Sequence, residues 1–200
     1  MIVITADQRG SRSSEDLVPA ALQQISIIGG DRLPFAPDRN AGDEIQVATE
    51  DGRTALEIIL HLVRTEEWAV GVGVGGMEEE RGTEIRAARG EAFIHARAAV
   101  ERAKAAPSRF ALVGAEPSAA EDAEALIRLL LELRSRRTGP GWEVFDHLAA
   151  GESQKDIAAR LGISETAVSL RARAAGLRAD EAAVPALARV LDRLNGVGRP

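Results

Sequence analysis

Two aspartates lie where the sequence predicts the ends of neighbouring β-strands. Asp7 follows the first apolar run of the chain, and Asp43 lies in a polar turn between predicted strands at residues 33–38 and 44–49. In a β-α-β-β-α-β sheet the first strand pairs with the third, which brings both carboxylates to one edge. Adjacent carboxylates repel each other, and Mg²⁺ relieves this repulsion while it binds phosphate oxygens of a ligand. We therefore expect Mg²⁺ held by Asp7 and Asp43, with Glu44 as a third ligand.

The loop after the first predicted strand has the composition of a phosphate-binding turn. It contains Arg9, Gly10, Ser11 and Arg12 and leads into a predicted helix. Backbone N–H groups at a helix N-terminus favour anions, and a guanidinium group matches the geometry of phosphate. We expect a nucleotide ligand at this loop. The alternative is an inert domain in which Asp7 and Asp43 are merely exposed at strand ends.

A second candidate site lies near the C-terminus, where residues 154–169 match the spacing of a helix-turn-helix. Ile157 and Val168 would share one small core, Gly162 permits a left-handed turn, and Ser164 would cap the second helix. In this motif the second helix lies in the major groove of double-stranded DNA. The alternative is a three-helix packing module that binds no nucleic acid.

Polar and basic residues on the outer surface of this motif would contact DNA. Hydroxyl, carboxylate and guanidinium groups read base edges, and further cations bind phosphates. The expected DNA-binding residues are Lys155, Arg160, Ser164, Glu165, Thr166, Ser169, Leu170, Arg171 and Arg173. Arg171 takes a position that is usually apolar, and we expect Leu170 or Ala172 to close the core instead.

One recognition helix spans few bases, so we expect a homodimer. Residues 181–195 carry an apolar stripe that would form the dimer surface. The alternative is that this stripe packs back on its own domain.

Hydrophobic periodicity predicts the elements that position both sites. The first part of the chain has the order β-α-β-β-α-β, followed by a further helix and strand. This order predicts the α+β class: a ferredoxin-like or palm domain, with an antiparallel sheet and helices on one face, followed by an all-α helix-turn-helix domain. We expect the palm domain at 1–117, a connecting helix at 118–138 and the helix-turn-helix domain at 139–200.

Several short motifs resemble the palm of class III nucleotide cyclases. They are residues 5–11, the Gly-Asp-Glu hairpin at 42–44, the glycine-rich strand at 70–75 and residues 90–97. With the C-terminal motif included, the chain more closely resembles the SatD family of small bacterial proteins. This resemblance implies a palm followed by a helix-turn-helix, together with a metal–nucleotide site, and it implies no reaction.

Two departures from the cyclases argue against catalysis. Cyclases carry an asparagine one helical turn from an arginine, whereas here Phe93 stands one turn before Arg97. The lysine that selects adenine in cyclases has no clear counterpart, because Lys104 and Lys155 lie outside the corresponding strands. Catalysis needs groups placed for the transition state as well as a metal.

Composition excludes some classes of protein. The 200 residues include no cysteine, which excludes a thiol nucleophile and a cysteine-bound zinc, and we expect no haem or flavin. No apolar run of about 18 residues occurs, so we expect no membrane association and a cytoplasmic protein. The formal net charge of −6 is uneven, since residues 153–179 carry five basic and two acidic residues.

Two functions are consistent with these patterns. The first is a DNA-binding bacterial transcription regulator whose palm-like domain senses a ligand or mediates assembly. The alternative is a Mg-dependent nucleotide-binding or cyclase-like enzyme with a regulatory helix-turn-helix. The missing asparagine and the basic segment favour the first, with double-stranded DNA as the partner and no catalytic residues.

Overall fold

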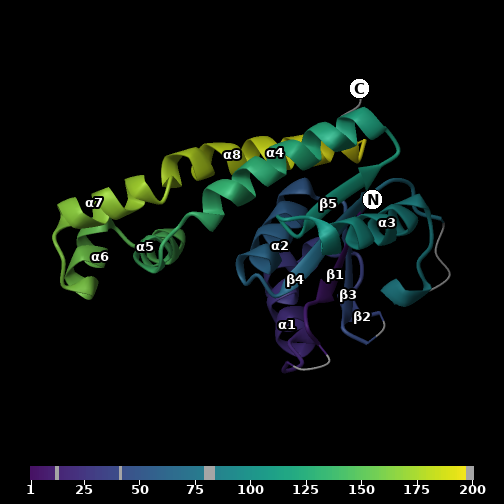
Figure 1. The fold of residues 1–200 in the computed structure, drawn as a ribbon, viewed down its shortest axis with the longest axis horizontal. Coiled ribbons are helices and arrows are strands. Elements are labelled where there is room, and N and C mark those ends of the chain that lie inside the picture. Colours follow the sequence, from purple (N-terminus) through teal and green to yellow (C-terminus); the bar gives the residue numbers. More distant parts are fainter. Residues whose placement is uncertain (12–13, 41, 79–83, 197–200) are drawn as a thin grey trace. The chain divides into compact units, whose positions relative to one another are not determined.

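The computed structural model of the chain describes residues 1–11, 14–40, 42–78 and 84–196, and it has a mixed α+β fold (Figure 1). Along the chain the elements are β1 (Ile2–Gln8), α1 (Val18–Gly29), a 3₁₀ turn (Gly30–Arg32), β2 (Asp38–Arg39), β3 (Glu44–Thr49), α2 (Gly52–Arg64), β4 (Trp68–Val74), a second 3₁₀ turn (Ile85–Ala87), α3 (Glu91–Ala105), β5 (Phe110–Gly114), α4 (Pro117–Ser135), α5 (Gly139–Ala149), α6 (Gln154–Leu161), α7 (Glu165–Ala174) and α8 (Leu177–Leu194).

The five strands form one mixed sheet in the order β2-β3-β1-β4-β5. β1 is antiparallel to both β3 and β4, whereas β5 is parallel to β4, so the sheet is mixed, and the antiparallel pairing that we expected is limited to β2, β3, β1 and β4. The predicted strand at 33–38 is also largely absent, because β2 contains only Asp38 and Arg39. Pro34 and Pro37 lack the N–H group that a strand needs, and they confine pairing to the end of this segment.

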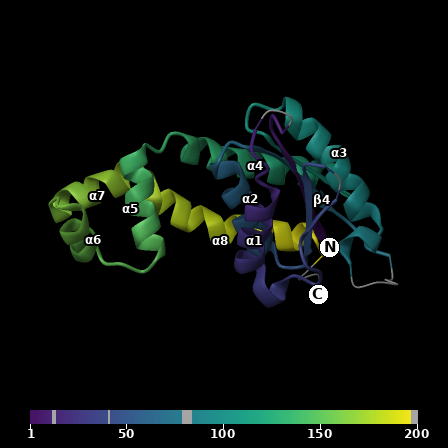
Figure 2. The same cartoon turned by 90° about the horizontal axis from the view of Figure 1, so that it is seen from below.

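Helices cover both faces of the sheet, which corrects the expectation of helices on one face only. α3 packs against β4, β5 and β1, while α2 packs against β4, β1 and β3 from the other side (Figures 1 and 2). Every residue of β4 is buried. A strand that is covered on both faces needs small or apolar residues throughout, and this explains the nearly continuous apolar run.

The glycines of β4 allow α3 to lie directly against the sheet. A Cβ atom at Gly71 would collide with the backbone of Val100, and one at Gly73 would collide with the backbones of Ala92 and Ala96. Small side chains continue this contact, since Ala69, Ala99, Ala103 and Ala111 form a buried cluster. α3 is therefore held by the close approach of its backbone to the strand, and it places its C-terminal end near the edge of the sheet.

The chain divides into two compact units: Met1–Arg128 with Pro185–Pro200, and Leu129–Val184. This division differs from the predicted one, because the final residues belong with the sheet. Oδ1 of Asp192 accepts a 2.7 Å hydrogen bond from the backbone N–H of Gly52, and Nδ2 of Asn195 donates to the carbonyl of Glu50. These bonds hold residues 192–195 beside the start of α2.

The apolar stripe of α8 is covered within the chain. Leu187 is 7% exposed and Leu191 is completely buried. The stripe that we expected to form a dimer surface thus takes the alternative role, and it packs on the protein's own core. A homodimer would need another surface.

The second unit has its own small core between α5, α6 and α7 (Figure 2). Val144, Ile157, Ala158 and Val168 are buried together there. Outside this core, Arg137 is buried and its guanidinium lies 4.8 Å from the ring centre of Phe145. The unit is therefore stabilised by a small apolar core and by aromatic and charged contacts.

Candidate functional sites

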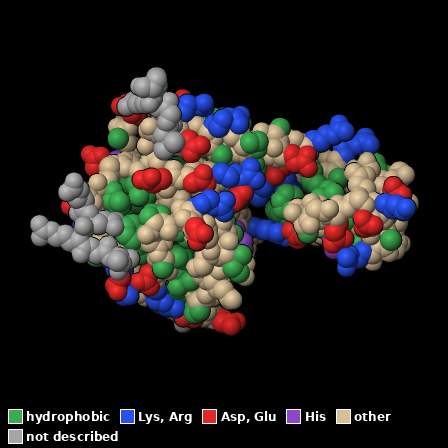
Figure 3. Space-filling view, turned by 180° about the vertical axis from the view of Figure 1, so that it is seen from behind, with side chains coloured by type: hydrophobic (Ala, Val, Ile, Leu, Met, Phe, Trp, Pro, Cys, Tyr) green, Lys and Arg blue, Asp and Glu red, His purple; other side chains and the backbone are tan. Residues whose placement is uncertain are grey.

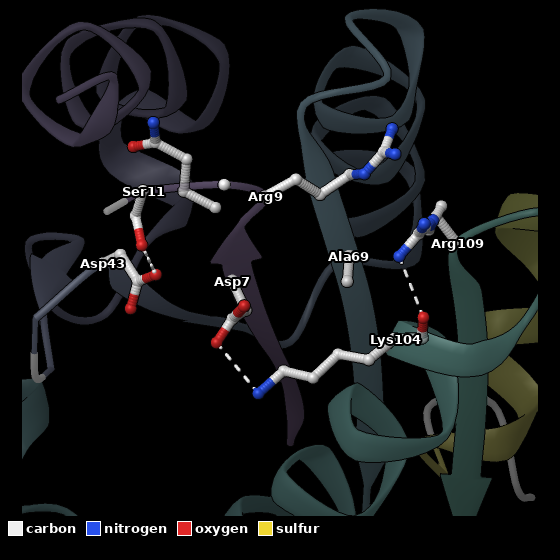
Figure 4. A pocket seen from close by; sticks show the side chains of 9 residues that line it. Asp7, Arg9, Ser11, Asp43, Ala69, Lys104 and Arg109 are labelled. Atoms are coloured by element: carbon white, nitrogen blue, oxygen red, sulfur yellow. Dashed lines mark hydrogen bonds and ion pairs between the residues drawn. The ribbon is translucent and has the colours of Figure 1, made fainter. Parts of the chain in front are cut away.

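A cavity of about 450 Å³ lies at the edge of the sheet where β1 ends and β3, β4 and β5 begin. These ends meet because β1 runs antiparallel to β3 and β4, while β5 runs parallel to β4. The loop after β1 and the end of α3 complete the wall (Figure 4). The lining residues are Asp7, Gln8, Arg9, Gly10, Ser11, Asp43, Ala69, Lys104 and Arg109.

Asp7 forms an ion pair with Lys104 at this cavity. Nζ of Lys104 lies 3.0 Å from Oδ2 of Asp7 and donates a 2.9 Å hydrogen bond to Oε1 of Glu101. Figure 4 shows the lysine side chain extending from α3 toward Asp7. Burial lowers the pKa of Lys104, but hydrogen bonds to Glu101 and Asp7 outweigh it and raise the pKa above its ordinary value. The negative charge of Asp7 is therefore balanced by an ammonium group.

The other two expected metal ligands have protein partners as well. Ser11 donates a hydrogen bond from Oγ to Oδ2 of Asp43 (Figure 4). Glu44 lies opposite Asp7 in the strand register, but it accepts a hydrogen bond from Asn40 and does not line the cavity. Among the described residues no three His, Asp or Glu side chains are grouped so that they would hold a metal ion. A Mg²⁺ ion bound to Asp7 and Asp43 would therefore have to compete with Lys104 and Ser11 for these carboxylates.

Two arginines add positive charge to the cavity. Nη1 of Arg9 donates a 2.8 Å hydrogen bond to the carbonyl of Glu66, and Nη1 of Arg109 donates a 2.8 Å hydrogen bond to the carbonyl of Lys104. Each bond fixes the position of a guanidinium group at the rim. With Lys104, the lining contains three cations and two carboxylates.

The expected phosphate loop is only partly at this cavity. Arg9, Gly10 and Ser11 line it, and Gly10 adopts a left-handed conformation with φ of 63°. Arg12 lies outside the described residues. The helix N-terminus that we expected to assist does not take part, because α1 begins only at Val18 and none of its residues lines the cavity.

Sequence reasoning missed Lys104 and Arg109 as members of this site. Arg109 directly precedes β5, so a parallel β4–β5 pair places it at the edge where β1 ends. The β-α-β order of these segments was a usable signal, since strands joined by such a crossover are commonly parallel. Lys104 gave no local signal, because its position depends on the close packing of α3 on the sheet.

The second candidate site is formed by α6, α7 and the turn between them. Gly162 ends α6 in the left-handed region, with φ of 64°. Ser153 caps α6 by accepting a hydrogen bond from the N–H of Asp156, and Ser164 caps α7 by accepting one from the N–H of Ala167. Ser164 is therefore occupied in positioning the helix.

Most of the residues that we expected to contact DNA are exposed. Glu165, Thr166, Arg173 and Lys155 are exposed, and Ser169 is half-buried. Leu170 is 54% exposed. The α5–α6–α7 core includes the partly buried Ala172. Of the two residues that we expected to close this core, Ala172 packs against it and Leu170 does not.

Two of the expected phosphate-binding cations form ion pairs within the protein. Nε of Arg160 lies 3.1 Å from Glu152, and Nη1 of Arg171 lies 3.3 Å from Glu143. On the face drawn in Figure 3, acidic and basic side chains are interspersed over this unit. The surface around α7 is therefore of mixed charge.

A comparison with protein-family models, with curated proteins and with solved structures finds no match to this chain. The resemblance to the SatD family stays a prediction, and function is argued from the two sites alone. None of the described helices combines the length and the apolar character needed to span a bilayer.

Proposed function

We propose that the protein binds double-stranded DNA through a helix-turn-helix formed by α6 and α7. The observation that carries this proposal is the pair of capped helices joined at the left-handed Gly162, with Glu165 and Thr166 exposed in the first turn of α7. Helices joined in this way present the N-terminal residues of the second helix to base edges in the major groove. A transcription regulator is the class of protein that such binding would serve.

The exposed and half-buried residues of α7 have side chains suited to base edges. Thr166 and Ser169 donate and accept hydrogen bonds, Glu165 accepts from cytosine, and Arg173 donates to guanine. Leu170 adds an apolar contact. These five residues are the proposed determinants of sequence preference.

The three cations proposed to contact phosphate differ in whether they must first give up an ion pair within the protein. Lys155 is exposed at the start of α6. Arg160 and Arg171 would have to exchange their bonds with Glu152 and Glu143 for bonds to phosphate. We therefore expect Lys155 to contribute most to non-specific affinity, with the other two adding less.

The sheet unit supports a palm-like interpretation. Read without β5, the strand order β2-β3-β1-β4 is the order of a ferredoxin-like sheet, and β5 extends it by one parallel strand. We propose that this unit senses a ligand at the cavity beside Asp7. The second candidate function, a Mg-dependent nucleotide-binding or cyclase-like enzyme, rests on Asp7 and Asp43 lining the same cavity.

The DNA proposal is tested by selecting preferred sequences from a random duplex library and measuring affinity by fluorescence anisotropy. We expect the logarithm of the affinity to fall with the logarithm of salt concentration, by about 0.9 for each phosphate contact. Arg173→Ala should lower specific affinity by about 1–3 kcal/mol and relax the preference at one position. Lys155→Ala should weaken binding to all sequences and reduce the salt slope by about 1.

A matched control is Arg136→Ala, because Arg136 is exposed in the same unit but lies outside α6 and α7. It removes one positive charge and should leave sequence preference unchanged. Absence of salt-sensitive binding at every protein concentration that remains in solution would contradict the proposal. Two copies on one selected site would support a homodimer.

A further inference from the structure

We propose that the cavity beside Asp7 binds a phosphate-bearing small anion directly, with Lys104 in the place that a metal ion would take. This inference goes beyond DNA binding, and it rests on the proposal that the sheet unit senses a ligand at this cavity. It starts from the finding that Asp7 already has a cationic partner at the cavity, the ammonium group of Lys104.

The ammonium group of Lys104 already does what Mg²⁺ would do for Asp7. Nζ lies 3.0 Å from the carboxylate of Asp7, which removes the unbalanced negative charge at the edge of the sheet. A Mg²⁺ ion bound to Asp7 would have to displace this ammonium group or lie next to it. Two cations beside the same carboxylate repel each other strongly.

The lining retains donors for an anion. A lysine ammonium group has three N–H donors, of which Asp7 and Glu101 take two. A guanidinium group has five, and the backbone bonds of Arg9 and Arg109 use one in each. Guanidinium and ammonium groups are the side chains that bind phosphate oxygens most strongly.

The size of the cavity indicates a ligand larger than a single phosphate. Sites for small molecules typically enclose about 300–1,000 Å³, and this cavity has about 450 Å³. In Figure 4 the pair of Ser11 and Asp43 lies on one side of the view, while Arg9 and Arg109 lie on the other. The amino end of Lys104 lies below Asp7, between these two sides, and we place the phosphate groups between Lys104 and the arginines, away from Asp43.

Calorimetric titration of the full chain with inorganic pyrophosphate, in excess EDTA, tests the proposal. We expect binding without any divalent metal ion. Lys104→Ala should weaken it by about tenfold or more, the effect of losing one charge-assisted hydrogen bond. Arg97→Ala is the matched control, since it removes an exposed cation from the same helix outside the cavity and should change affinity by less than about twofold.

Asp7→Asn separates direct binding from metal-mediated binding by the sign of its effect. If Lys104 binds the anion, this substitution releases the lysine and removes a repelling carboxylate, and affinity should rise by about fivefold. If a metal ion mediates binding, the same substitution removes a metal ligand, and affinity should fall. A gain of affinity cannot arise from misfolding, so this variant keeps the test valid where Lys104→Ala is poorly folded.

Binding that occurs only after Mg²⁺ replaces EDTA, or that disappears in Asp7→Asn, would overturn the proposal. So would the absence of pyrophosphate binding by the wild-type chain. No DNA is present in this titration, and its outcome is therefore independent of the outcome for the helix-turn-helix.

Discussion

Asp180 is a single carboxylate on which two arginines converge. Its Oδ1 accepts hydrogen bonds of 2.6 Å from Nε of Arg134 and 2.7 Å from Nη2 of Arg137, and its side chain is 4% exposed. Burial raises the pKa of Asp180, but the hydrogen bonds and charges of the two arginines outweigh it and hold the pKa below its ordinary value. The carboxylate therefore remains charged at neutral pH and joins the start of α8 to the end of α4.

We expect Asp180→Asn to lower the free energy of unfolding by about 3–5 kcal/mol, because it removes the negative charge that two largely buried guanidinium groups share. Urea denaturation at neutral pH measures this cost. The pKa of Asp180 is lower in the folded state than in the unfolded chain. The ionised carboxylate therefore contributes its full stabilisation above the ordinary pKa of Asp, about 4, and this stabilisation is lost as the pH falls below that value. The difference in the free energy of unfolding between wild type and Asp180→Asn should therefore become smaller in acid.

The matched control for this carboxylate is Glu132→Gln. Glu132 pairs with Arg136 on the surface of the same unit, where the two side chains are 62% and 75% exposed. Exposed pairs contribute little, and the expected cost is below about 1 kcal/mol. Equal costs for the two variants would show that the buried network adds no stability of its own.

At the scale of elements, the packing of α3 on β4 determines which residues reach the cavity. Gly71 and Gly73 let the helix backbone approach the strand, and this places Lys104 at the end of α3 near Asp7. The alternating pattern at residues 68–74 predicts a strand, and β4 spans Trp68–Val74. That pattern does not reveal why glycine occupies these positions.

We expect Gly73→Ala to lower the free energy of unfolding by about 3 kcal/mol, because the new methyl group would overlap backbone atoms that cannot move independently. Gly114→Ala is the control, since its Cβ would meet the Cβ of Ala120 at an ordinary 3.4 Å. The control should cost less than about 1 kcal/mol. A Gly73→Ala protein as stable as the control would contradict the close approach of helix and strand.

At the scale of the whole molecule, α8 belongs to two compact units. Its first part lies in the unit of α5, α6 and α7, and from Pro185 onward the chain belongs to the sheet unit. Leu191 is fully buried in this second part. The sheet unit is thus assembled from two segments separated by the unit that carries the proposed DNA-binding motif.

We expect Leu191→Ala to destabilise the protein by about 2–5 kcal/mol, the usual cost of truncating a buried leucine. The molar mass in analytical ultracentrifugation should be the same as that of wild type, because the stripe is buried within the chain. Ile94→Ala is the control, since Ile94 is 70% exposed in the same unit. A variant of unchanged stability that loses a wild-type dimer would show that α8 is an intermolecular surface.

The sequence by itself determined the local features of this protein. Apolar patterning along the chain indicates the strands, and contacts between residues close in the chain produce the caps at Ser153 and Ser164 and the left-handed turn at Gly162. The pairing of β1 with β3 also followed from element order, and it placed Asp7 and Asp43 at one edge of the sheet.

Only the tertiary structure decided which distant segments these strands, helices and side chains contact. The parallel addition of β5, the return of residues 185–200 to the sheet and the ion pair between Asp7 and Lys104 all join segments far apart in the chain. Such contacts depend on how closely distant elements pack and in which register, and local periodicity carries little information about either. The sequence therefore indicated a carboxylate edge suited to a metal ion, whereas packing supplied the lysine that occupies it.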